Sequence, residues 1–201
     1  MSTSRSDDSR FRAEISSGFP GLSKSQLEAL CAHYRLLLAW NKRLNLTRVV
    51  SAADAAQVHY VESLFLGTCL PPGPLRVADV GSGAGFPGIP VAILRSECTI
   101  DLIESHQRKA VFLREAARDL SNTRVLSRRA EDVAPQYDWV VSRAIRPKDV
   151  LSFGLASNVA LLISTGDAGS TQTFPIQGSN QRVVAIYRDV PRGTLPGHDK
   201  I

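Results

Sequence analysis

The sequence predicts an α/β fold built on a mostly parallel sheet, and three observations lead to this prediction. After residue 73, short apolar segments alternate with amphipathic ones. A glycine-rich turn follows the first apolar segment, and acidic residues follow the second and third. Such alternation is typical of doubly wound parallel sheets, in which helices cover both faces. The 201 residues, of which 43% are hydrophobic, are enough for one substantial core.

Before that region, the sequence indicates a polar tail and a helical cap. Residues 1–18 are rich in Ser, Arg and Asp, and we expect them to be a disordered tail. Residues 19–72 hold two helical patterns and form the expected cap. The helix starts are indicated by polar pairs three residues apart, which are Ser23 with Gln26 or Ser25 with Glu28 for the first helix and Ser51 with Asp54 for the second.

The remaining residues, 73–201, are expected to form a Rossmann-like domain that makes one compact unit with the cap. Apolar, β-prone segments predict strands at 75–80, 99–104, 124–127, 139–142 and 159–164. Amphipathic segments between them predict helices near 86–94, 107–120 and 147–157. The segments "TQTFPIQ" and "RVVAIYRDV" are β-rich with no helix between them, so they predict a terminal antiparallel hairpin.

The glycine turn, "ADVGSGAGFPG", departs from the dinucleotide-binding pattern GxGxxG. Gly81 and Gly83 fit that pattern, but Phe86 takes the place of the third glycine and Gly85 comes one residue early. Asp79 precedes the turn, and a buried acid there would repel the pyrophosphate that a dinucleotide brings to the helix start. The same acid is compatible with a cationic sulfonium and ammonium. The spacing D-x-G-x-G-x-G resembles motif I of the class I S-adenosylmethionine-dependent methyltransferases.

Two acidic positions support an adenosine ligand. Glu104 ends the second predicted strand about 20 residues after the turn, where a carboxylate accepts hydrogen bonds from both ribose hydroxyls. NAD enzymes use the same device, so Glu104 indicates adenosine and does not identify the cofactor. Ala130 and Glu131 follow the third predicted strand, where methyltransferases hold the adenine. A tight turn without any ligand remains the alternative.

Charge and composition limit the classes of function. The net charge of +5 and the pI near 9.4 suit a polyanionic partner. The three cysteines are far apart and show no metal-ligand spacing, so we expect reduced thiols and no metal. The sequence shows no signal-peptide pattern and no apolar run of membrane length, which predicts a cytoplasmic protein without a membrane partner. The basic residues gather in two clusters, Arg124, Arg128 and Arg129 and then Arg143, Arg146 and Lys148.

The end of the fourth predicted strand, "SRAI", argues against two kinds of methyl acceptor. Amine methylases carry an Asn/Asp-Pro-Pro-aromatic segment there, and cytosine C5 methylases need a cysteine nearby, which this chain lacks. Guanine N7 needs neither device, because it carries a lone pair and no proton, so positioning supplies most of the catalysis. Arg143 is the candidate for that role, through a bidentate contact with the methionine carboxylate or an RNA phosphate. A surface salt bridge is the alternative for this residue.

Four segments, taken together, resemble one known family. They are "NKRLNLT" at 41–47, "HYVES" at 59–63, "ADVGSGAGFPGIPVAIL" at 78–94 and "SRA" at 142–144. In this order they closely resemble the bacterial glucose-inhibited division protein B family, whose members methylate guanine N7 in the 530 loop of 16S ribosomal RNA. The resemblance covers roughly residues 36–151. It implies S-adenosylmethionine as the cofactor and 16S rRNA or the small ribosomal subunit as the partner of an enzyme that we expect to be a monomer.

The motif and the resemblance together imply a set of site residues. The expected cofactor-binding residues are Asp79, Gly81, Gly83, Gly85, Phe86, Glu104, Ala130, Glu131 and Arg143. Arg143 is also the expected catalytic residue, through positioning alone, since no general base is required. RNA phosphates are expected at Arg108, Lys109, Arg128, Arg129, Arg146 and Lys148. Supporting roles are expected for His59 and Ser63, which lie one helical turn apart. Asn41 and Asn45, also one turn apart, are expected to hydrogen-bond the loop between elements rather than the substrate.

The chain departs from the family pattern at three places. Glu62 stands where the family usually has Asp, and Gln107-Arg108-Lys109 stands for Gly-Lys-Arg. After Ser164 a polar segment, "TGDAGSTQTFPIQGSNQ", replaces the usual Lys-Gly and helix. The last departure leaves the RNA contacts of the C-terminal hairpin open. The alternatives are a methyltransferase for a small molecule or a protein, a non-catalytic ribosome-binding relative and an NAD(P) oxidoreductase.

Overall fold

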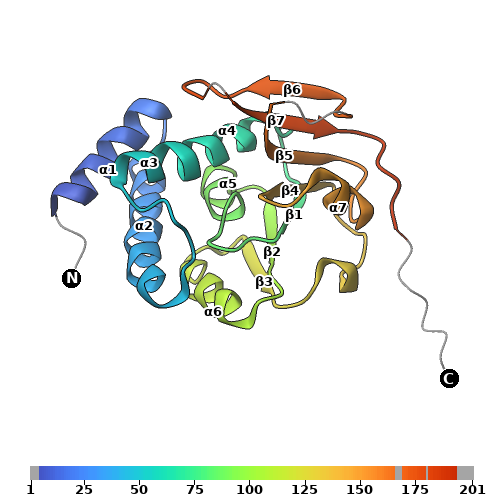
Figure 1. Cartoon of the computed structure of the whole chain (residues 1–201), viewed down its shortest axis with the longest axis horizontal. Helices are drawn as coiled ribbons and strands as arrows, with labels where there is room; N and C mark the ends of the chain where they lie inside the picture. Colours follow the sequence, from blue (N-terminus) through green and yellow to red (C-terminus); the bar gives the residue numbers. More distant parts are fainter. Residues whose placement is uncertain (1–4, 166–168, 180, 194–201) are drawn as a thin grey trace.

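A computed structural model describes residues 5–165, 169–179 and 181–193. Its centre is a seven-stranded sheet with the order β3-β2-β1-β4-β5-β7-β6 (Figure 1). The first five strands are parallel, and β7 is antiparallel to both β5 and β6. The strands are β1 (Arg76–Val80), β2 (Thr99–Ile103), β3 (Thr123–Leu126), β4 (Trp139–Arg143), β5 (Val159–Ser164), β6 (Gln172–Pro175) and β7 (Arg182–Tyr187). The predicted parallel sheet with a terminal antiparallel hairpin is confirmed.

The two predicted cap helices begin where the sequence indicates. Ser23 forms a reciprocal capping box with Gln26, and the Ser51 side chain accepts a hydrogen bond from the Asp54 backbone N–H. The α-helices are α1 (Arg5–Gly18), α2 (Lys24–Leu44), α3 (Ala52–Ala55), α4 (Glu62–Cys69), α5 (Gly88–Leu94), α6 (Gln107–Ala116) and α7 (Pro147–Ser152). A π-helical turn, η1 (Ala56–Val61), joins α3 to α4, and η2 (Ala130–Asp132) is a short 3₁₀ turn. None of the helices in the described ranges is both long and apolar enough to cross a membrane.

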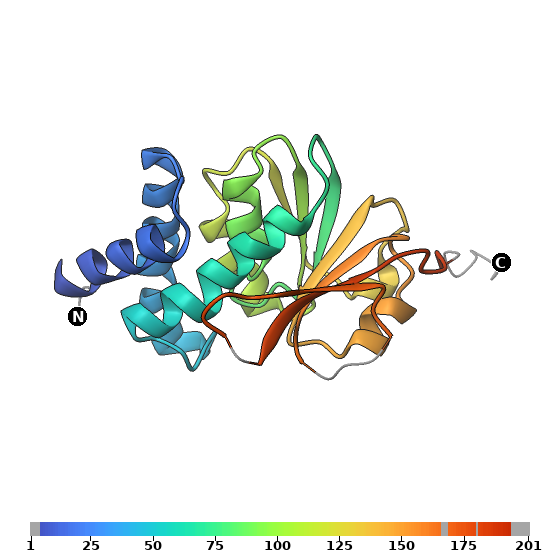
Figure 2. The ribbon, with the colours of Figure 1, turned by 90° about the horizontal axis from the view of Figure 1, so that it is seen from above.

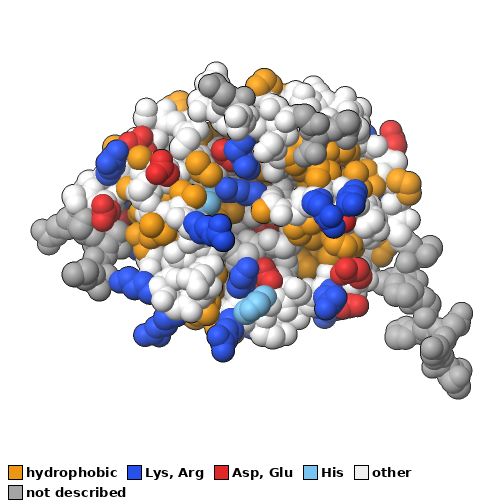
Figure 3. All heavy atoms as spheres, in the orientation of Figure 1, with side chains coloured by type: hydrophobic (Ala, Val, Ile, Leu, Met, Phe, Trp, Pro, Cys, Tyr) orange, Lys and Arg blue, Asp and Glu red, His pale blue; other side chains and the backbone are white. Residues whose placement is uncertain are grey.

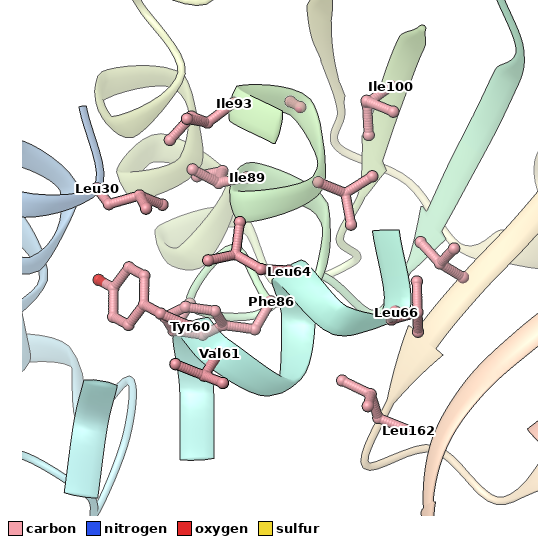
Figure 4. Close-up of a cluster of buried hydrophobic side chains, with 14 of the residues drawn as sticks. Leu30, Tyr60, Val61, Leu64, Leu66, Phe86, Ile89, Ile93, Ile100 and Leu162 are labelled. Carbon is pink, nitrogen blue, oxygen red and sulfur yellow. The ribbon is translucent and has the colours of Figure 1, made fainter. Parts of the chain in front are cut away.

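The cap and the sheet domain share one core. Helices α1, α2 and α3 lie together on one side of the molecule, and α4 runs from them along α5 toward β5 (Figures 1 and 2). Leu30 of α2, Leu64 of α4 and Ile89 of α5 are fully buried in the same cluster (Figure 4). The opposite face of the sheet packs against a second cluster that includes Val150 of α7. Because successive strand residues point to opposite faces, both clusters draw on every central strand.

The N-terminal segment corrects one prediction. Residues 1–18 were expected to be a disordered tail, but α1 begins at Arg5, and residues 1–4 lie outside the described part of the chain. Phe11 and Ile15 of α1 are fully buried, and the Phe11 ring stacks on Tyr34 with centroids 4.1 Å apart. Two apolar residues four positions apart lie on one helix face. Because the residues around Phe11 and Ile15 are polar, the sequence pattern did not indicate a buried helix here.

Two helices end earlier than predicted. α6 stops at Ala116 rather than near residue 120, and the chain continues in a turn closed by the Leu120 N–H and the Ala117 carbonyl. α7 stops at Ser152 rather than near residue 157, because Gly154 adopts a left-handed φ of 57° that cannot continue a helix. Both differences lengthen the non-helical connection to the next strand.

Candidate functional site

The glycine turn lies at the carboxyl end of β1, and its glycines are required by the backbone. Gly81, Gly83 and Gly85 have φ values of 71°, 56° and 89°, in the left-handed region that other residues rarely adopt. A Cβ at Gly81 would lie 2.4 Å from Cδ1 of Ile145, so the loop after β4 packs directly on the turn. The Gly81 and Ser82 N–H groups donate to the Ile103 carbonyl at the end of β2. The turn is therefore held between the ends of its two neighbouring strands.

Asp79 supports the turn from below. Its side chain is fully buried, and its Oδ2 accepts the Gly88 N–H at the start of α5 at 3.0 Å. Burial raises the pKa of this carboxyl to about 7. We expected Asp79 beside the charged groups of a cofactor, but the structure places it behind the turn rather than in the cavity described next. Its location reflects helix anchoring, since Cβ of an alanine at Gly88 would lie 2.5 Å from Asp79 Oδ2.

A cavity of about 320 Å³, here called the glycine-loop cavity, opens beside the turn. Glu104 forms its acidic wall, where its carboxylate accepts the Gly83 N–H at 3.0 Å and the His106 N–H at 2.7 Å. A carboxylate has about four acceptor sites, so both oxygens keep capacity for further donors. The cavity is lined by Val80, Gly81, Ile103, Glu104, Ser105, Arg128, Arg129, Ala130, Glu131, Ile145 and Phe153. Strands β1, β2 and β3 thus bring the predicted Gly81, Glu104, Ala130 and Glu131 together.

Phe86 has a different place from the one expected. Its side chain is 6% exposed and lies in an aromatic cluster with the cap rather than in the wall of the glycine-loop cavity. Its ring stacks on His59 with centroids 4.7 Å apart and meets Tyr60 edge to face at 4.9 Å. Figure 4 shows Tyr60 and Phe86 side by side. The cap therefore fixes the glycine turn through Phe86.

His59 connects the cap to the end of β4. Its Nδ1 lies 2.7 Å from Arg143 Nη1, and its Nε2 lies 2.8 Å from Thr47 Oγ1. A guanidinium only donates, so Nδ1 is the acceptor and the ring proton lies on Nε2, facing Thr47. Burial and the charge of Arg143 lower the pKa of His59 to about 3, which keeps the ring neutral. Ser63 donates its hydroxyl to the His59 carbonyl within the helix and does not reach the cavities.

Asn41 holds the other end of this connection. Its side-chain amide donates to the Thr47 carbonyl and accepts the Thr47 N–H, each at 2.8 Å. Asn45 ends α2 in the left-handed conformation with φ of 49°. Asn41, Thr47, His59 and Arg143 thus form one hydrogen-bonded chain, here called the Asn41–Arg143 network. It joins three of the four segments that carried the family resemblance, and the stacking on Phe86 adds the fourth.

Arg143 is half-buried at the end of β4. Its Nη1 also donates to the Val58 carbonyl at 2.9 Å, so its partners among the described residues are a carbonyl and an imidazole rather than the carboxylate of a surface salt bridge. Burial and the nearby Arg182 lower the pKa of Arg143 to about 10, which leaves it charged at neutral pH. Ala144 follows with a left-handed φ of 64°. Such backbone strain in a residue other than glycine is concentrated at functional sites.

A second, larger cavity of about 570 Å³ lies beside the ends of β4 and β5 and is here called the basic cavity. Four cations, Arg143, Arg146, Lys148 and Arg182, line it together with apolar residues and Ser164. Among its described lining residues none is acidic. Ile145 lines both cavities, so the two adjoin at this residue. Figure 3 shows several Lys and Arg side chains near the middle of the face that it displays.

The predicted RNA-binding cations fall into three groups. Arg146 and Lys148 line the basic cavity, whereas the exposed Arg128 and Arg129 line the glycine-loop cavity. Arg108 and Lys109 lie in the first turn of α6 and line neither. Arg124, counted with the basic clusters, is paired with Asp101 and is not part of either cavity. No group of three or more potential metal ligands occurs among the described residues.

Comparison with known proteins identifies the family. Residues 26–159 match the GidB family, described as rRNA small subunit methyltransferase G. The chain belongs to this family. The resemblance to the glucose-inhibited division protein B family is therefore confirmed. The match includes the glycine turn, Glu104 and Arg143 but ends before the hairpin that carries Arg182.

Relatives in this family are similar over most of the matched part. A Desulforamulus reducens protein named ribosomal RNA small subunit methyltransferase G is 37% identical over 143 residues, which are 65% of this chain and 58% of that protein. A Syntrophus aciditrophicus protein of the same name is 36% identical over 155 residues, which are 71% of this chain and 64% of that protein. The matched chain thus spans less than two thirds of the length of either relative.

Solved structures of low sequence identity share the fold. An Aquifex aeolicus SAM-dependent methyltransferase matches with a TM-score of 0.54 at 13% identity, over 68% of this chain and 93% of that one. A Pyrococcus horikoshii protein, provisionally described as an RNA methyltransferase, matches with a TM-score of 0.52 at 12% identity, over 92% of this chain and 99% of that one. These likenesses confirm the predicted Rossmann-like methyltransferase fold.

The sequence analysis did not single out Arg182 and Phe153, which line the cavities, or Thr47, which belongs to the Asn41–Arg143 network. Arg182 lies at the start of β7, far along the chain from the motifs, and only its strand register opposite Ser164 brings it to the basic cavity. Phe153 lies in a loop without any motif. Thr47 is the last residue of "NKRLNLT", and its place in this motif was the available signal for its hydrogen bonds with Asn41 and His59.

Proposed function

We propose that this GidB-family chain is an S-adenosylmethionine-dependent methyltransferase that modifies guanine N7 in the 530 loop of 16S rRNA, acting in the cytoplasm on the small ribosomal subunit. One observation carries the proposal: the glycine-loop cavity and the basic cavity adjoin at Ile145. The first has the acidic wall formed by Glu104, and the second is lined by cations. Membership of the family and the names of its relatives support the same assignment.

The glycine-loop cavity suits the adenosine part of the cofactor. Three left-handed glycines keep side chains off the turn, and the Glu104 carboxylate is fixed by two backbone N–H groups with acceptor capacity left for ribose hydroxyls. Ala130, Ile103 and Ile145 provide apolar walls for a purine ring. Adenosylmethionine, when bound, supplies a methyl group that is activated by its sulfonium. Glu104 and the backbone of the turn would hold it.

The residues beside the acceptor need only to position it. Guanine N7 carries a lone pair and no proton, so no side chain has to remove a proton before attack on the methyl group. His59 fits this requirement, because it is neutral and both of its ring nitrogens are already hydrogen-bonded. The Asn41–Arg143 network holds the Arg143 guanidinium at the mouth of the basic cavity. Orientation of this kind supplies much of the barrier reduction when no bond to the enzyme forms.

The proposal is tested by mapped methylation. The protein is incubated with methyl-labelled adenosylmethionine and small subunits from cells that lack 7-methylguanosine in the 530 loop, and the RNA is cleaved chemically at 7-methylguanosine. We expect label in 16S rRNA and one cleavage within that loop. Binding of adenosylhomocysteine without any transfer to RNA would contradict the RNA acceptor and favour a small molecule or a protein. Stabilisation by NAD and not by adenosylhomocysteine would contradict the cofactor.

A further inference from the structure

Arg182 is the member of the basic cavity that no motif predicted. It begins β7, pairs in register with Ser164 at the end of β5 and lies beyond the part of the chain that matches the family. Its side chain is 26% exposed, and its Nε lies 2.8 Å from Oε2 of the buried Glu62. Although this distance is that of an ion pair, the N–H does not point at the oxygen. Nε and Nη2 are therefore buried without a hydrogen-bond partner among the described residues.

Two of the four cations of this cavity have a carboxylate partner, Arg146 with Asp149 and Arg182 with Glu62, each at 2.8 Å, but neither carboxylate lines the cavity. Glu62 is the acid that faces Arg182, and burial raises the pKa of its carboxyl while the charges of Arg182 and Arg143 lower it. Arg182 and Arg143 are close enough for their charges to repel, which contributes to the lowered pKa of Arg143. Buried donors without partners carry a cost of about 1–3 kcal/mol each, and more when charged. Because the Arg182 side chain is partly exposed and lines the cavity with Arg143, an anionic ligand there would add a counter-charge to both guanidiniums.

The chemistry of the cavity distinguishes between two anions. The methionine carboxylate of the cofactor is one candidate, but the same cofactor carries a sulfonium and an ammonium, which Arg143 and Arg182 would repel. A phosphodiester has no such cation, and its two free oxygens match the fork of a guanidinium. The cavity, at about 570 Å³, also exceeds what one carboxylate fills. The cavity lies next to the glycine-loop cavity, where an acceptor nucleotide must reach.

We propose that the basic cavity binds a phosphodiester of the RNA next to the methylated nucleotide and that Arg182 is its principal ligand, with Arg143 beside it. This inference rests on the proposed function, because it assigns a contact to the RNA substrate of the same site. Arg146 and Lys148 are exposed and add positive charge, and Arg146 is also paired with Asp149 at 2.8 Å. Arg182 thereby gives the C-terminal hairpin a role in substrate binding.

The test compares Arg182→Gln with Arg188→Gln. Both substitutions remove one positive charge, but Arg188 follows the other end of β7 and stacks over Trp139, 5.4 Å from its ring centroid. The dissociation constant for a 16S rRNA transcript is measured over a range of salt concentrations, and that for adenosylhomocysteine is measured separately. Because removing Arg182 leaves Glu62 unpaired, the double variant Glu62→Gln/Arg182→Gln is measured as well, with unfolding midpoints to confirm that each protein is folded.

We expect Arg182→Gln to weaken RNA binding about tenfold or more and to lower the slope of log affinity against log salt by about 0.7, the value for one contact with single-stranded RNA. Arg188→Gln should change neither quantity, and adenosylhomocysteine should bind all variants equally. Equal RNA affinity and slope in Arg182→Gln and wild type would overturn the inference alone. A loss of adenosylhomocysteine affinity would overturn it in favour of the carboxylate. A wild type that neither binds nor methylates 16S rRNA would instead refute the proposed function.

Discussion

The two adjoining cavities are built in different ways. The glycine-loop cavity depends on the backbone, since the left-handed Gly81 lines it and two backbone N–H groups fix the Glu104 carboxylate in its wall. The basic cavity is shaped by long side chains from β4, α7 and β7, and its described lining lacks a carboxylate. Backbone walls are rigid and depend on residue type at a few positions, whereas charged side chains adapt and act mainly through charge. We therefore expect substitutions in the glycine-loop cavity to weaken cofactor binding and substitutions of the cations in the basic cavity to weaken RNA binding.

The largest effect is expected where the backbone wall is anchored, at Gly88. Gly88→Ala would place a Cβ 2.4 Å from Leu102 Cδ2 and 2.5 Å from Asp79 Oδ2, and would strain the hydrogen bond that Asp79 accepts. We expect a loss of roughly 3 kcal/mol in the free energy of unfolding, measured with urea. Gly73→Ala is the control, because a Cβ there meets nothing within 4 Å and only its φ of 95° adds strain. Equal losses in both variants would contradict the anchoring role.

The next effect concerns the acidic wall. Glu104→Gln removes the charge that ribose hydroxyls would meet, and we expect adenosylhomocysteine to bind about ten- to thirtyfold more weakly, from a loss of about 1.5–2 kcal/mol. Glu97→Gln is the matched control, since Glu97 precedes β2 as Glu104 follows it and pairs with Arg95 at the surface. Calorimetric titration measures both. If Glu104→Gln bound adenosylhomocysteine as tightly as wild type, the proposed contact between Glu104 and the ribose would be wrong.

Per pH unit, a smaller effect is expected from the titration of Asp79. The folded pKa of about 7 lies above the ordinary value of 3.8, so between these values the folded state binds more protons than the unfolded state. Stability should then fall as pH rises from about 4 to 7, by up to about 1.4 kcal/mol per pH unit, and level off above pH 7. The difference in unfolding free energy between wild type and Asp79→Asn should follow this curve. A constant difference from pH 5 to 8 would show that Asp79 is ionised throughout.

The smallest effect is expected in the Asn41–Arg143 network, which orients Arg143 in the wall of the basic cavity. Thr47→Val removes the hydroxyl that receives the His59 Nε2 proton, so Arg143 loses orientation but keeps its charge. We expect kcat for methyl transfer to fall about fivefold, equivalent to about 1 kcal/mol, with KM for RNA nearly unchanged. Thr47→Ser should restore the rate, and Thr68→Val, on an exposed part of α4, should not affect it. A rise in KM without a change in kcat would contradict a positioning role.

The features that could be predicted from the sequence are those set by residues close together in the chain. Local patterns predicted the strands β1 to β5, the starts of α2 and α3, and the hairpin, because periodicity and capping are encoded by near neighbours. The glycine turn and Glu104 were predictable for a related reason, since each sits at the end of an apolar strand. The α1 helix was missed because Phe11 and Ile15 are only two apolar residues among polar ones, and burial against Tyr34 decides their structure.

Residues brought in from distant parts of the chain were beyond prediction. Arg182 reaches the basic cavity through the pairing of β7 with β5, and sequence spacing does not record that pairing. Asp79 and Phe86 belong to the predicted motif, yet their side chains point away from the glycine-loop cavity, toward α5 and the cap. Spacing identifies which residues form a turn, whereas the packing behind the turn decides where each side chain points.

The central claim is that the two cavities hold different partners of one reaction. The most direct test is a set of four dissociation constants, for adenosylhomocysteine and for 16S rRNA with Glu104→Gln and with Arg182→Gln. The account predicts a crossed result, in which Glu104→Gln loses adenosylhomocysteine affinity and keeps RNA affinity, while Arg182→Gln does the reverse. If each variant instead weakened both ligands to the same extent, the cavities would form a single site and the division of roles would be wrong.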